Sequence, residues 1–570
     1  MKRTHFFYLF AFIIIFCFIF RSLLLNFTSN LPDWYDYPFA VWVISQGAQK
    51  LINLDFLNLF NTNAFYPHTN TAFFTDLMLP QSLIAIPISL FSNNPLILFN
   101  FVFIITYVLN YISVYVFWQS LFKNSLVSFL GSLFIIFSPY FYLEMGHFQM
   151  QSYWPFFFSL LLTIKSVQNK NPRLGIFAGL ICAIQFLTSV YLGVFLLFTI
   201  SLFIIIKLLF DNQKLKTFKI YLLILLSFLL ISGVFIKGYL NTKRQYNIIR
   251  SPNEFIQYSA HVSDYFFTSS IHSFVHVSPL IKIWNSFDKH IIGSKASFPG
   301  FTLFTLAIFS LVSIKISKKQ IDIKTSLSHQ NLFFVLLLLS GAVFSWGPRV
   351  NFNGNYASIP SPYYIFLKFV PLLESVRAPS RWSFLFYLGI VYFALSTIQK
   401  IQKKNNAWLI IILISIIFLL EYLPLNIKTH GEEYTNSGYQ ALSDLCKDNK
   451  LVLLEVPITH FDGNGGIING LNRVTKYELS SLTHGCYLKN GYSGYDLPEL
   501  LAFKDKFYTV LSKNNSQLLI NFLKAESINL IKINKDQLSG TAFSDYSQIF
   551  PELYKSSKIK QLDNDIFLIQ

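Results

Sequence analysis

Two aspartates, Asp33 and Asp36, follow the first long apolar run of the sequence, within Leu-Pro-Asp-Trp-Tyr-Asp-Tyr-Pro-Phe. Acidic side chains at a membrane face are costly unless they serve a purpose. The pair opens a polar and aromatic loop that ends in another acid, Asp76. A carboxylate here could act as a general base on an acceptor hydroxyl, a role typically worth about 10² to 10⁴ in rate. The same acids could instead cap an interfacial helix or solvate the loop.

Two arginines, Arg377 and Arg381, lie at the start of a later apolar run, within Val-Arg-Ala-Pro-Ser-Arg. A planar guanidinium binds two phosphate oxygens at once, so the pair favours a lipid phosphate or diphosphate as ligand. The alternative is that they anchor a helix end among the lipid headgroups. Two arginines separated by Ala-Pro-Ser are more than an anchor requires, and we therefore expect them to bind phosphate.

Two histidines and a glutamine complete the set of candidate binding residues. His147 and Gln149 follow a Ser-Pro-Tyr helix end, and His68 lies in the first loop. We expect these three and Asp76 to contact substrate, although a structural hydrogen bond is the other role open to such histidines. Asp36, Asp76 and a histidine could also supply the oxygen and imidazole ligands that suit Mg²⁺ or Mn²⁺. A divalent metal is thus a candidate cofactor, with its ligands unknown.

The composition indicates which scaffold must position these side chains. Of the 570 residues, 53% are hydrophobic and only 13% are charged, against about 25% charged in soluble domains. The deficit extends over the first three quarters of the chain, which indicates a polytopic membrane protein. A net charge of +17 would suggest nucleic acid in a soluble protein. Here the lysines and arginines gather between apolar runs and form no basic, aromatic face, so we expect no nucleic-acid partner.

Apolar runs of about 20 residues predict transmembrane helices. Two shorter stretches, 77–92 and 361–373, contain proline and border polar segments, so we expect them to lie in the interface without crossing. The N-terminal apolar stretch lacks a small-residue cleavage site and is interpreted as an uncleaved first span. The predicted spans lie near residues 6–28, 97–122, 125–143, 152–168, 174–190, 192–210, 217–236, 299–314, 331–346, 382–399 and 407–424.

The lysines and arginines also predict the sidedness of the loops. With about eleven spans, the inner loops hold the basic clusters, whereas the short outer loops around 144–152 and 189–193 hold none. We therefore expect a multi-pass protein of a prokaryotic cytoplasmic membrane, with a cytoplasmic N-terminus. The candidate acids, histidines and arginines then share the outer face, where we expect Asp36 and Arg377 to meet at headgroup level.

The composition changes after residue 425. Residues 426–570 are polar, with short β-rich runs and glycine-rich turns, and predict a small extracytoplasmic α/β domain beside a transmembrane domain of residues 1–425. Cys446 and Cys486 could form a disulfide if this part is extracytoplasmic. The segment 483–494, rich in Gly and Tyr, could bind an acceptor, although a turn-rich structural role is the simpler interpretation.

The ordered set of motifs resembles the GT-C superfamily of membrane glycosyltransferases, and in particular a poorly characterised YfhO-like branch with a C-terminal outer domain. Each motif is short, and their order over nearly the whole chain carries the resemblance. The matching pieces are Asp36 to Trp42, Ala64-Phe-Tyr-Pro-His with Asp76, Phe137-Ser-Pro-Tyr with Gly146-His-Phe-Gln, Thr188-Ser-Val-Tyr-Leu-Gly, Trp346-Gly-Pro, Arg377-Ala-Pro-Ser-Arg, and His484 to Gly494.

The resemblance implies an α-helical polytopic fold with interfacial helices, and an enzyme of the cell envelope. Such an enzyme moves a hexosyl or related group from a polyprenyl-phosphate donor to a glycan, lipid or protein acceptor at the extracytoplasmic face. Asp36, with Asp33 as the alternate, matches the position of the catalytic base, and Arg377 and Arg381 would hold the donor phosphate. The chain lacks an adjacent acidic pair and any recognisable sugar-binding residues, so the sugar and the metal requirement stay open.

Two other functions are compatible with this sequence. A transporter or flippase for lipid-linked glycans would need polar or charged residues buried within its spans, and the apolar runs are nearly free of them. A non-catalytic envelope-assembly protein would keep its function after Asp36→Asn, whereas a transferase would lose it. The sequence contains no P-loop, so it gives no support to ATP-driven transport.

Overall fold

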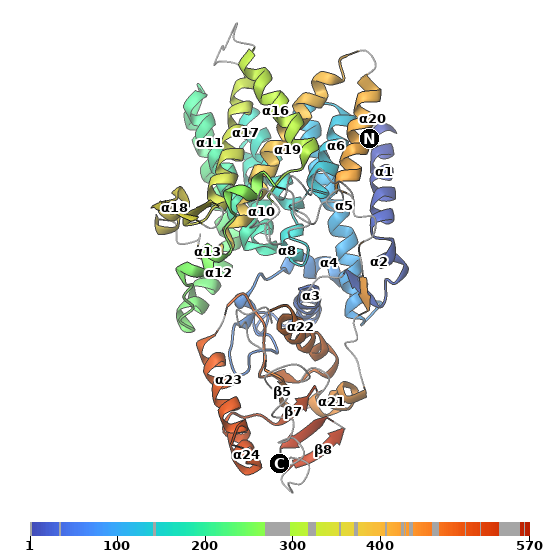
Figure 1. Cartoon of the computed structure of the whole chain (residues 1–570), viewed down its shortest axis with the longest axis vertical. Helices are drawn as coiled ribbons and strands as arrows, with labels where there is room; N and C mark the ends of the chain where they lie inside the picture. Colours follow the sequence, from blue (N-terminus) through green and yellow to red (C-terminus); the bar gives the residue numbers. More distant parts are fainter. Residues whose placement is uncertain are drawn as a thin grey trace. The chain divides into compact units, whose positions relative to one another are not determined.

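A computed structural model arranges the chain as helices, short strands and connecting segments (Figure 1). Asp33 lies outside the described residues, so its predicted role stays untested. The structure describes residues 3–32, 36–138, 140, 144–267, 297–316, 326–352, 355–369, 374–404, 407–422, 427, 429–431, 437–447, 449–458, 467–495, 497–513, 515–534, 559–563 and 565–569.

The chain divides into two compact units, each built from segments that are distant in sequence. The first unit consists of Met1–Leu25, Phe103–Phe235 and Ile249–Lys428, and the second of Asn26–Val102, Ile236–Ile248 and Thr429–Gln570. The first long loop therefore folds with the C-terminal segment, whereas Arg377 and Arg381 belong to the other unit. The second unit combines three separate parts of the chain, and only the last of them follows residue 425. The division into domains of residues 1–425 and 426–570 stays a prediction.

Apolar helices form most of the first unit. Among the described residues, four helical segments are long and apolar enough to cross a membrane: α5 (Pro95–Phe122), α11 (Val190–Phe210), α12 (Lys214–Gln245), and Pro379–Ile401, which contains α19 (Ser383–Ile401). The chain is therefore a multi-pass membrane protein. The number of spans and their sidedness stay predictions. Shorter apolar helical stretches are α1 (Arg3–Ile19), α4 (Leu79–Ser89), α6 (Ser125–Ile136), α10 (Pro172–Thr188), Phe301–Ser313 of α16 (Phe301–Ile316), His329–Ser345 of α17 (Ser326–Ser345) and Ala407–Glu421 of α20 (Ala407–Tyr422).

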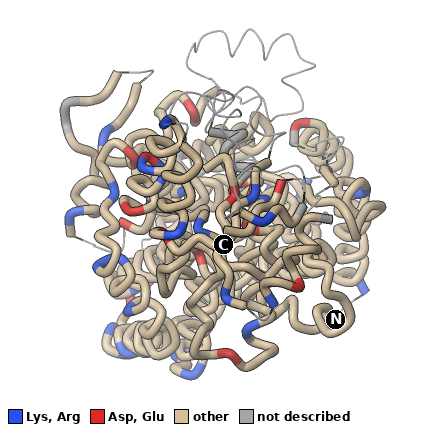
Figure 2. The backbone as a smooth tube through the Cα atoms, turned by 90° about the horizontal axis from the view of Figure 1, so that it is seen from below, with Lys and Arg blue, Asp and Glu red and all other residues tan. Residues whose placement is uncertain are grey.

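Charged residues make up 13% of the chain, and Figure 2 shows them as short segments scattered along the backbone. The two stretches that the sequence places in the interface form α4 and α18 (Pro362–Phe369). At 1.5 Å per residue these helices are about 16 Å and 12 Å long, too short for a hydrocarbon core of about 30 Å. α18 follows an antiparallel hairpin of β2 (Arg349–Phe352) and β3 (Asn355–Pro360).

Close helix packing fixes the start of α19, which directly follows the short helix that contains Arg381. α19 packs on α16 and α17. A Cβ at Gly389 of α19 would come within 2.9 Å of the Phe334 carbonyl oxygen in α17, and one at Gly341 within 2.2 Å of the Phe386 nitrogen. Only glycine permits such close backbone approach. The short 3-10 helix η4 (Pro379–Trp382), which contains Arg381, leads directly into this closely packed pair of helices.

A five-stranded sheet organises the second unit, in the order β6-β5-β7-β9-β8. β5 (Val452–Val456) pairs in parallel with β6 (Tyr487–Leu488) and β7 (Leu530–Ile533), while β9 (Ile566–Ile569) is antiparallel to β7 and to β8 (Ile559–Asp563). Both central strands are buried along their length, as expected for a sheet covered on both faces. The helices of this part are α21 (Ser437–Lys447), α22 (Ile467–His484), α23 (Pro498–Leu511) and α24 (Ser516–Ala525).

Two apolar clusters pack against this sheet. One joins it to α23 and α24 through residues such as Phe507 and Leu523. The other joins it to the first loop, because Trp42 and Phe74 share a cluster with Tyr477 and Leu488. α3 (Tyr37–Ile52) packs on both α4 and α22. The helix that begins beside Asp36 is thus held by the C-terminal part of the chain.

A disulfide joins Cys446, in α21, to Cys486, which precedes β6. Cross-linking restricts the unfolded chain, and such a bond typically contributes about 2 to 4 kcal/mol. We expect the double variant Cys446→Ser/Cys486→Ser to lower the free energy of unfolding of the second unit by that amount, measured by thermal unfolding. Cys17→Ser, which removes an exposed free thiol, is the control. Equal melting temperatures for the two variants would contradict this expectation.

Candidate functional site

Arg381 is buried in η4, just before α19, and is held by a glutamate from a distant loop. Its Nε lies 3.0 Å from Oε2 and 3.2 Å from Oε1 of Glu144. Its guanidinium also lies over the ring of Tyr191, 4.5 Å from the centroid, which is a favourable cation–π geometry. The charge of Arg381 is therefore compensated and its orientation fixed. The sequence predicted the arginine but gave no role to Glu144 or Tyr191.

His147 extends this cluster toward the surface. Its Nδ1 lies 3.4 Å from Oε2 of Glu144, and its side chain is 34% exposed. Burial and the charges of Arg381 and Arg377 lower the pKa of His147 well below its usual range, so the imidazole is neutral at physiological pH. Burial raises the pKa of Glu144, while the Arg381 guanidinium opposes that rise. The group can present a neutral imidazole next to a fixed guanidinium.

Arg377 is the more accessible of the two predicted arginines. Its side chain is 22% exposed, its guanidinium lies 4.9 Å from the ring centroid of Tyr258, and its Nε lies 3.7 Å from Oε1 of Glu254. The same oxygen accepts a hydrogen bond of 2.7 Å from Nη1 of Arg250. The sequence analysis missed Arg250 and Glu254. Arg-Ser-Pro-Asn-Glu carries a usable signal, since a serine cap, a proline and an acid begin a helix and Arg and Glu lie four apart.

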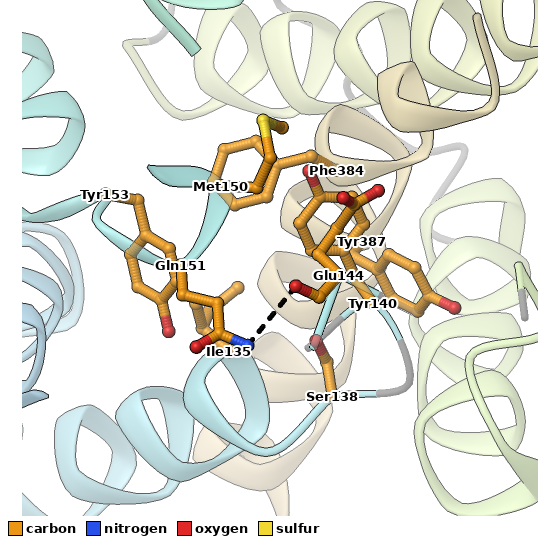
Figure 3. Close-up of a pocket in the computed structure, with 9 residues that line it drawn as sticks. All are labelled: Ile135, Ser138, Tyr140, Glu144, Met150, Gln151, Tyr153, Phe384 and Tyr387. Atoms are coloured by element: carbon orange, nitrogen blue, oxygen red, sulfur yellow. Dashed lines mark hydrogen bonds between the residues drawn. The ribbon is translucent and has the colours of Figure 1, made fainter. Parts of the chain in front are cut away.

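A small cavity beside Glu144 has a mixed lining, in which four of the nine residues are aromatic (Figure 3). Its volume of about 10 Å³ holds about one water molecule, too little for a sugar. Gln151 Nε2 donates to the Glu144 carbonyl oxygen at 3.3 Å, and the Tyr107 hydroxyl donates to Gln151 Oε1 at 3.0 Å. These bonds support the loop that carries Glu144. Gln149, on the short helix α8 (Phe148–Gln151), is half-buried.

Asp36 immediately precedes α3 in the second unit. Its side chain makes no capping hydrogen bond to the helix, although its carbonyl oxygen accepts from the Ala40 amide at 3.0 Å. The capping role considered for this aspartate is therefore absent. Its charge instead acts on Glu478 of α22, whose pKa burial raises well above the usual range and the Asp36 carboxylate raises further. The C-terminal segment thus places a second acid near the candidate base.

Glu478 is fully buried, and its Oε1 accepts a hydrogen bond of 2.8 Å from the Tyr492 amide. The Tyr492 ring contacts Phe39, one turn after Asp36, with ring centroids 5.1 Å apart. The glycine- and tyrosine-rich segment therefore packs against the start of α3. A role of this segment in acceptor binding stays a prediction.

The raised pKa of Glu478 predicts how stability depends on pH. The folded state holds this proton more tightly than the unfolded chain, so stability is lost as pH rises from about 4.3, the unfolded pKa, to the raised folded value. Glu478→Gln keeps a neutral group and removes this dependence. We expect the melting temperature of the wild type to fall relative to the variant as pH rises across this window. A difference in melting temperature between wild type and Glu478→Gln that does not change with pH would contradict the raised pKa of Glu478.

Asp76 and His68 of the first loop also belong to the second unit. Asp76 is nearly buried just after η1 (Thr71–Phe74). His68 Nε2 lies 3.4 Å from Oε2 of Glu499 in α23, and burial lowers the pKa of His68. Within the described ranges, no three His, Cys, Asp or Glu side chains are grouped to hold a metal ion. A site for Mg²⁺ or Mn²⁺ stays a prediction.

The structure therefore brings His147, Arg377 and Arg381 together in one unit. It places Asp36, with His68 and Asp76, in the other. The expected meeting of Asp36 with the arginines stays a prediction.

A family model described as a domain of unknown function, DUF6311, matches residues 53–420. The chain belongs to the DUF6311 family. The matched region contains Glu144, His147, Arg250 and Arg377. The narrower resemblance to YfhO-like proteins stays a prediction. No curated protein sequence matches this DUF6311 chain significantly.

Solved structures show the same fold at low sequence identity. The mycobacterial arabinofuranosyltransferase AftD is 13% identical with a TM-score of 0.58, over 96% of the DUF6311 chain but only 39% of AftD. The oligosaccharyltransferase AglB of Archaeoglobus fulgidus, bound to an inhibitory peptide and a dolichol-phosphate, is 11% identical with a TM-score of 0.52, over 93% of this chain and 69% of AglB. The apo oligosaccharyltransferase of A. fulgidus is 12% identical with a TM-score of 0.50, over the same shares of the two chains. The chain therefore shares its fold with AftD and AglB.

Proposed function

We propose that this DUF6311 protein is a glycosyltransferase that moves a sugar from a polyprenyl-phosphate donor to a glycan, lipid or protein acceptor at the extracytoplasmic membrane face. The observation that carries the proposal is the fold shared with AftD and AglB over more than nine tenths of the chain. AglB was solved with a dolichol-phosphate, a lipid of the proposed donor class. Since the chain spans about two fifths of AftD, the sugar is left open.

The side chains fit distinct roles in such a transfer. The acceptor oxygen attacks the anomeric carbon, its proton passes to Asp36, and the bond from that carbon to the phosphate oxygen breaks. The prenyl phosphate leaves with the negative charge, which Arg377 and Arg381 stabilise. Arg381, already held by Glu144, contributes a fixed field, and the more exposed Arg377 contacts the phosphate. Asp33 is the alternate base, and His147, Gln149, His68 and Asp76 are proposed to contact substrate.

The disulfide supports the proposed sidedness. Disulfides form and persist in oxidising compartments outside the cytoplasm, and Cys446–Cys486 lies within the unit that contains Asp36. An extracytoplasmic location of this unit would place the candidate base on the same side as lipid-linked donors.

The direct test uses the full chain in nanodiscs with synthetic farnesyl-phosphate hexoses and pentoses, and a membrane lipid extract as acceptor source. Mass spectrometry measures released farnesyl phosphate and glycosylated product together. We expect one donor to yield both, and the yield to depend on Asp36. Absence of transfer from every donor, with intact and correctly inserted protein, would overturn the proposal in favour of a flippase or a non-catalytic envelope protein.

A further inference from the structure

In the first unit, the Glu254 carboxylate lies between Arg250 and Arg377, two arginines from separate segments. Oε1 of Glu254, in α13 (Pro252–Gln257), lies 2.7 Å from Arg250 Nη1 and 3.7 Å from Arg377 Nε. The first distance is that of a charge-assisted hydrogen bond, whereas the second exceeds hydrogen-bond length. The Glu254 carboxylate therefore hydrogen-bonds to Arg250 and lies close to Arg377 at a longer distance.

The two guanidinium groups are held in place around this carboxylate. The Arg250 side chain is 10% exposed and that of Glu254 is 24% exposed. The Arg377 guanidinium lies over the ring of Tyr258. The Tyr258 carbonyl oxygen accepts a hydrogen bond of 3.1 Å from the Ser380 amide, which ties the α13 segment to η4. The arginines are thus pre-positioned, and the carboxylate between them is partly open to solvent.

Arg381 differs from Arg377 both in its exposure and in the distance to its glutamate partner. It is nearly buried, and both Glu144 oxygens lie within 3.2 Å of its Nε. Its carboxylate partner cannot leave without stranding a buried charge, which is costly. Of the arginine–glutamate contacts in this cluster, the one at Glu254 is therefore the one that an incoming anion can replace.

We propose that Glu254 occupies, in the unliganded protein, the position of a lipid phosphate, and that Arg250 and Arg377 together bind the phosphate when it displaces this carboxylate. The inference deepens the proposed function by adding Arg250 to the phosphate-binding residues and by giving Glu254 a placeholder role. A phosphate monoester or diphosphate presents more oxygens than a carboxylate, so it can engage both guanidinium groups at hydrogen-bond distance. Glu254 keeps two nearby cations compensated until the lipid arrives.

The test measures farnesyl phosphate binding to the full chain in nanodiscs, without any sugar transfer. Glu254→Gln removes the competing charge, so we expect it to tighten binding about tenfold. Arg250→Gln removes a charge-assisted bond and is expected to weaken binding about tenfold. Arg349→Gln, which alters an exposed arginine on β2, is the matched control and should leave affinity unchanged.

Competition by inorganic phosphate and by farnesol distinguishes recognition of a free phosphate from recognition of a lipid phosphate. If the headgroup alone is recognised, inorganic phosphate competes at similar concentration and Glu254→Gln strengthens that competition. If a lipid phosphate is recognised, inorganic phosphate competes weakly and farnesol does not compete. Glu254→Asp, which shortens the side chain, provides a second route to tighter binding if Glu254→Gln folds poorly, as judged by thermal unfolding.

Two outcomes would overturn the inference: unchanged or weaker binding in both Glu254 variants, or unchanged binding in Arg250→Gln. Unchanged or weaker binding in both Glu254 variants would give Glu254 a purely structural role. Unchanged binding in Arg250→Gln would show that Arg250 does not bind the phosphate. Failure of the proposed function has a different signature, because the binding shifts would appear while no donor supports transfer.

Discussion

Asp36→Asn is expected to lower the rate of sugar transfer by about 10² to 10⁴ while the protein still folds and inserts. The amide has nearly the same shape but accepts no proton from the acceptor hydroxyl. Because the Asp36 side chain does not cap α3, its replacement removes no helix-capping bond. Turnover of the farnesyl-phosphate donor by purified variant and wild type, at equal amounts of inserted protein, measures the effect.

A second aspartate of the first loop offers a matched control. Asp55 accepts a hydrogen bond of 3.0 Å from Asn58 Nδ2, and Asp55→Asn should retain wild-type transfer. Asp33→Asn distinguishes the alternate base, since the larger loss identifies the residue that takes the proton. Equal rates for wild type, Asp36→Asn and Asp33→Asn would contradict base catalysis from this loop and favour a non-catalytic role.

The buried pair of Glu144 and Arg381 carries the second large effect. Removing one partner of a buried ion pair typically costs about 3 to 5 kcal/mol, because the other charge is left uncompensated. We expect Arg381→Gln and Glu144→Gln each to destabilise the first unit by this amount, measured as the change in free energy of unfolding in detergent. The double variant should recover most of the loss, because it leaves neither charge stranded.

The double variant also separates stability from phosphate binding. It lacks the Arg381 charge, so transfer should stay at least tenfold below wild type even when the protein is as stable. Single variants that each lie within about 1 kcal/mol of wild type, the range typical of exposed pairs, would contradict the buried pairing. Recovery of both stability and transfer in the double variant would remove Arg381 from the phosphate site.

Local sequence patterns predicted the elements more completely than the contacts between them. Apolar runs predicted the long helices α5, α11 and α12, and their length and proline content kept α4 and α18 from being read as spans. Arg377 and Arg381 were recognisable because two guanidinium groups beside a span start are unusual. Their partners were not, because Glu144 and Glu254 come from segments more than 100 residues away in the chain and contacts of that range leave no periodic signal.

In the second unit, too, the sequence predicted the elements but not the contacts between distant segments. Polar composition predicted an α/β segment after residue 425, and the pairing of Cys446 with Cys486 was considered as one possibility. That the first loop packs on this segment was not predictable, since α3 has an apolar face that could have met lipid as well as α22. The fully buried Glu478 has no sequence signature either, because an acid in an amphipathic helix usually faces water.

The most direct test of the account is a cryo-EM structure of the full chain in nanodiscs with a non-hydrolysable farnesyl-phosphonate sugar. The account predicts headgroup density bound by Arg250 and Arg377, with Glu254 displaced and the Asp36 carboxylate facing the anomeric carbon at the same membrane face. Headgroup density at another location, or Asp36 at the opposite membrane face from the bound phosphonate, would contradict it.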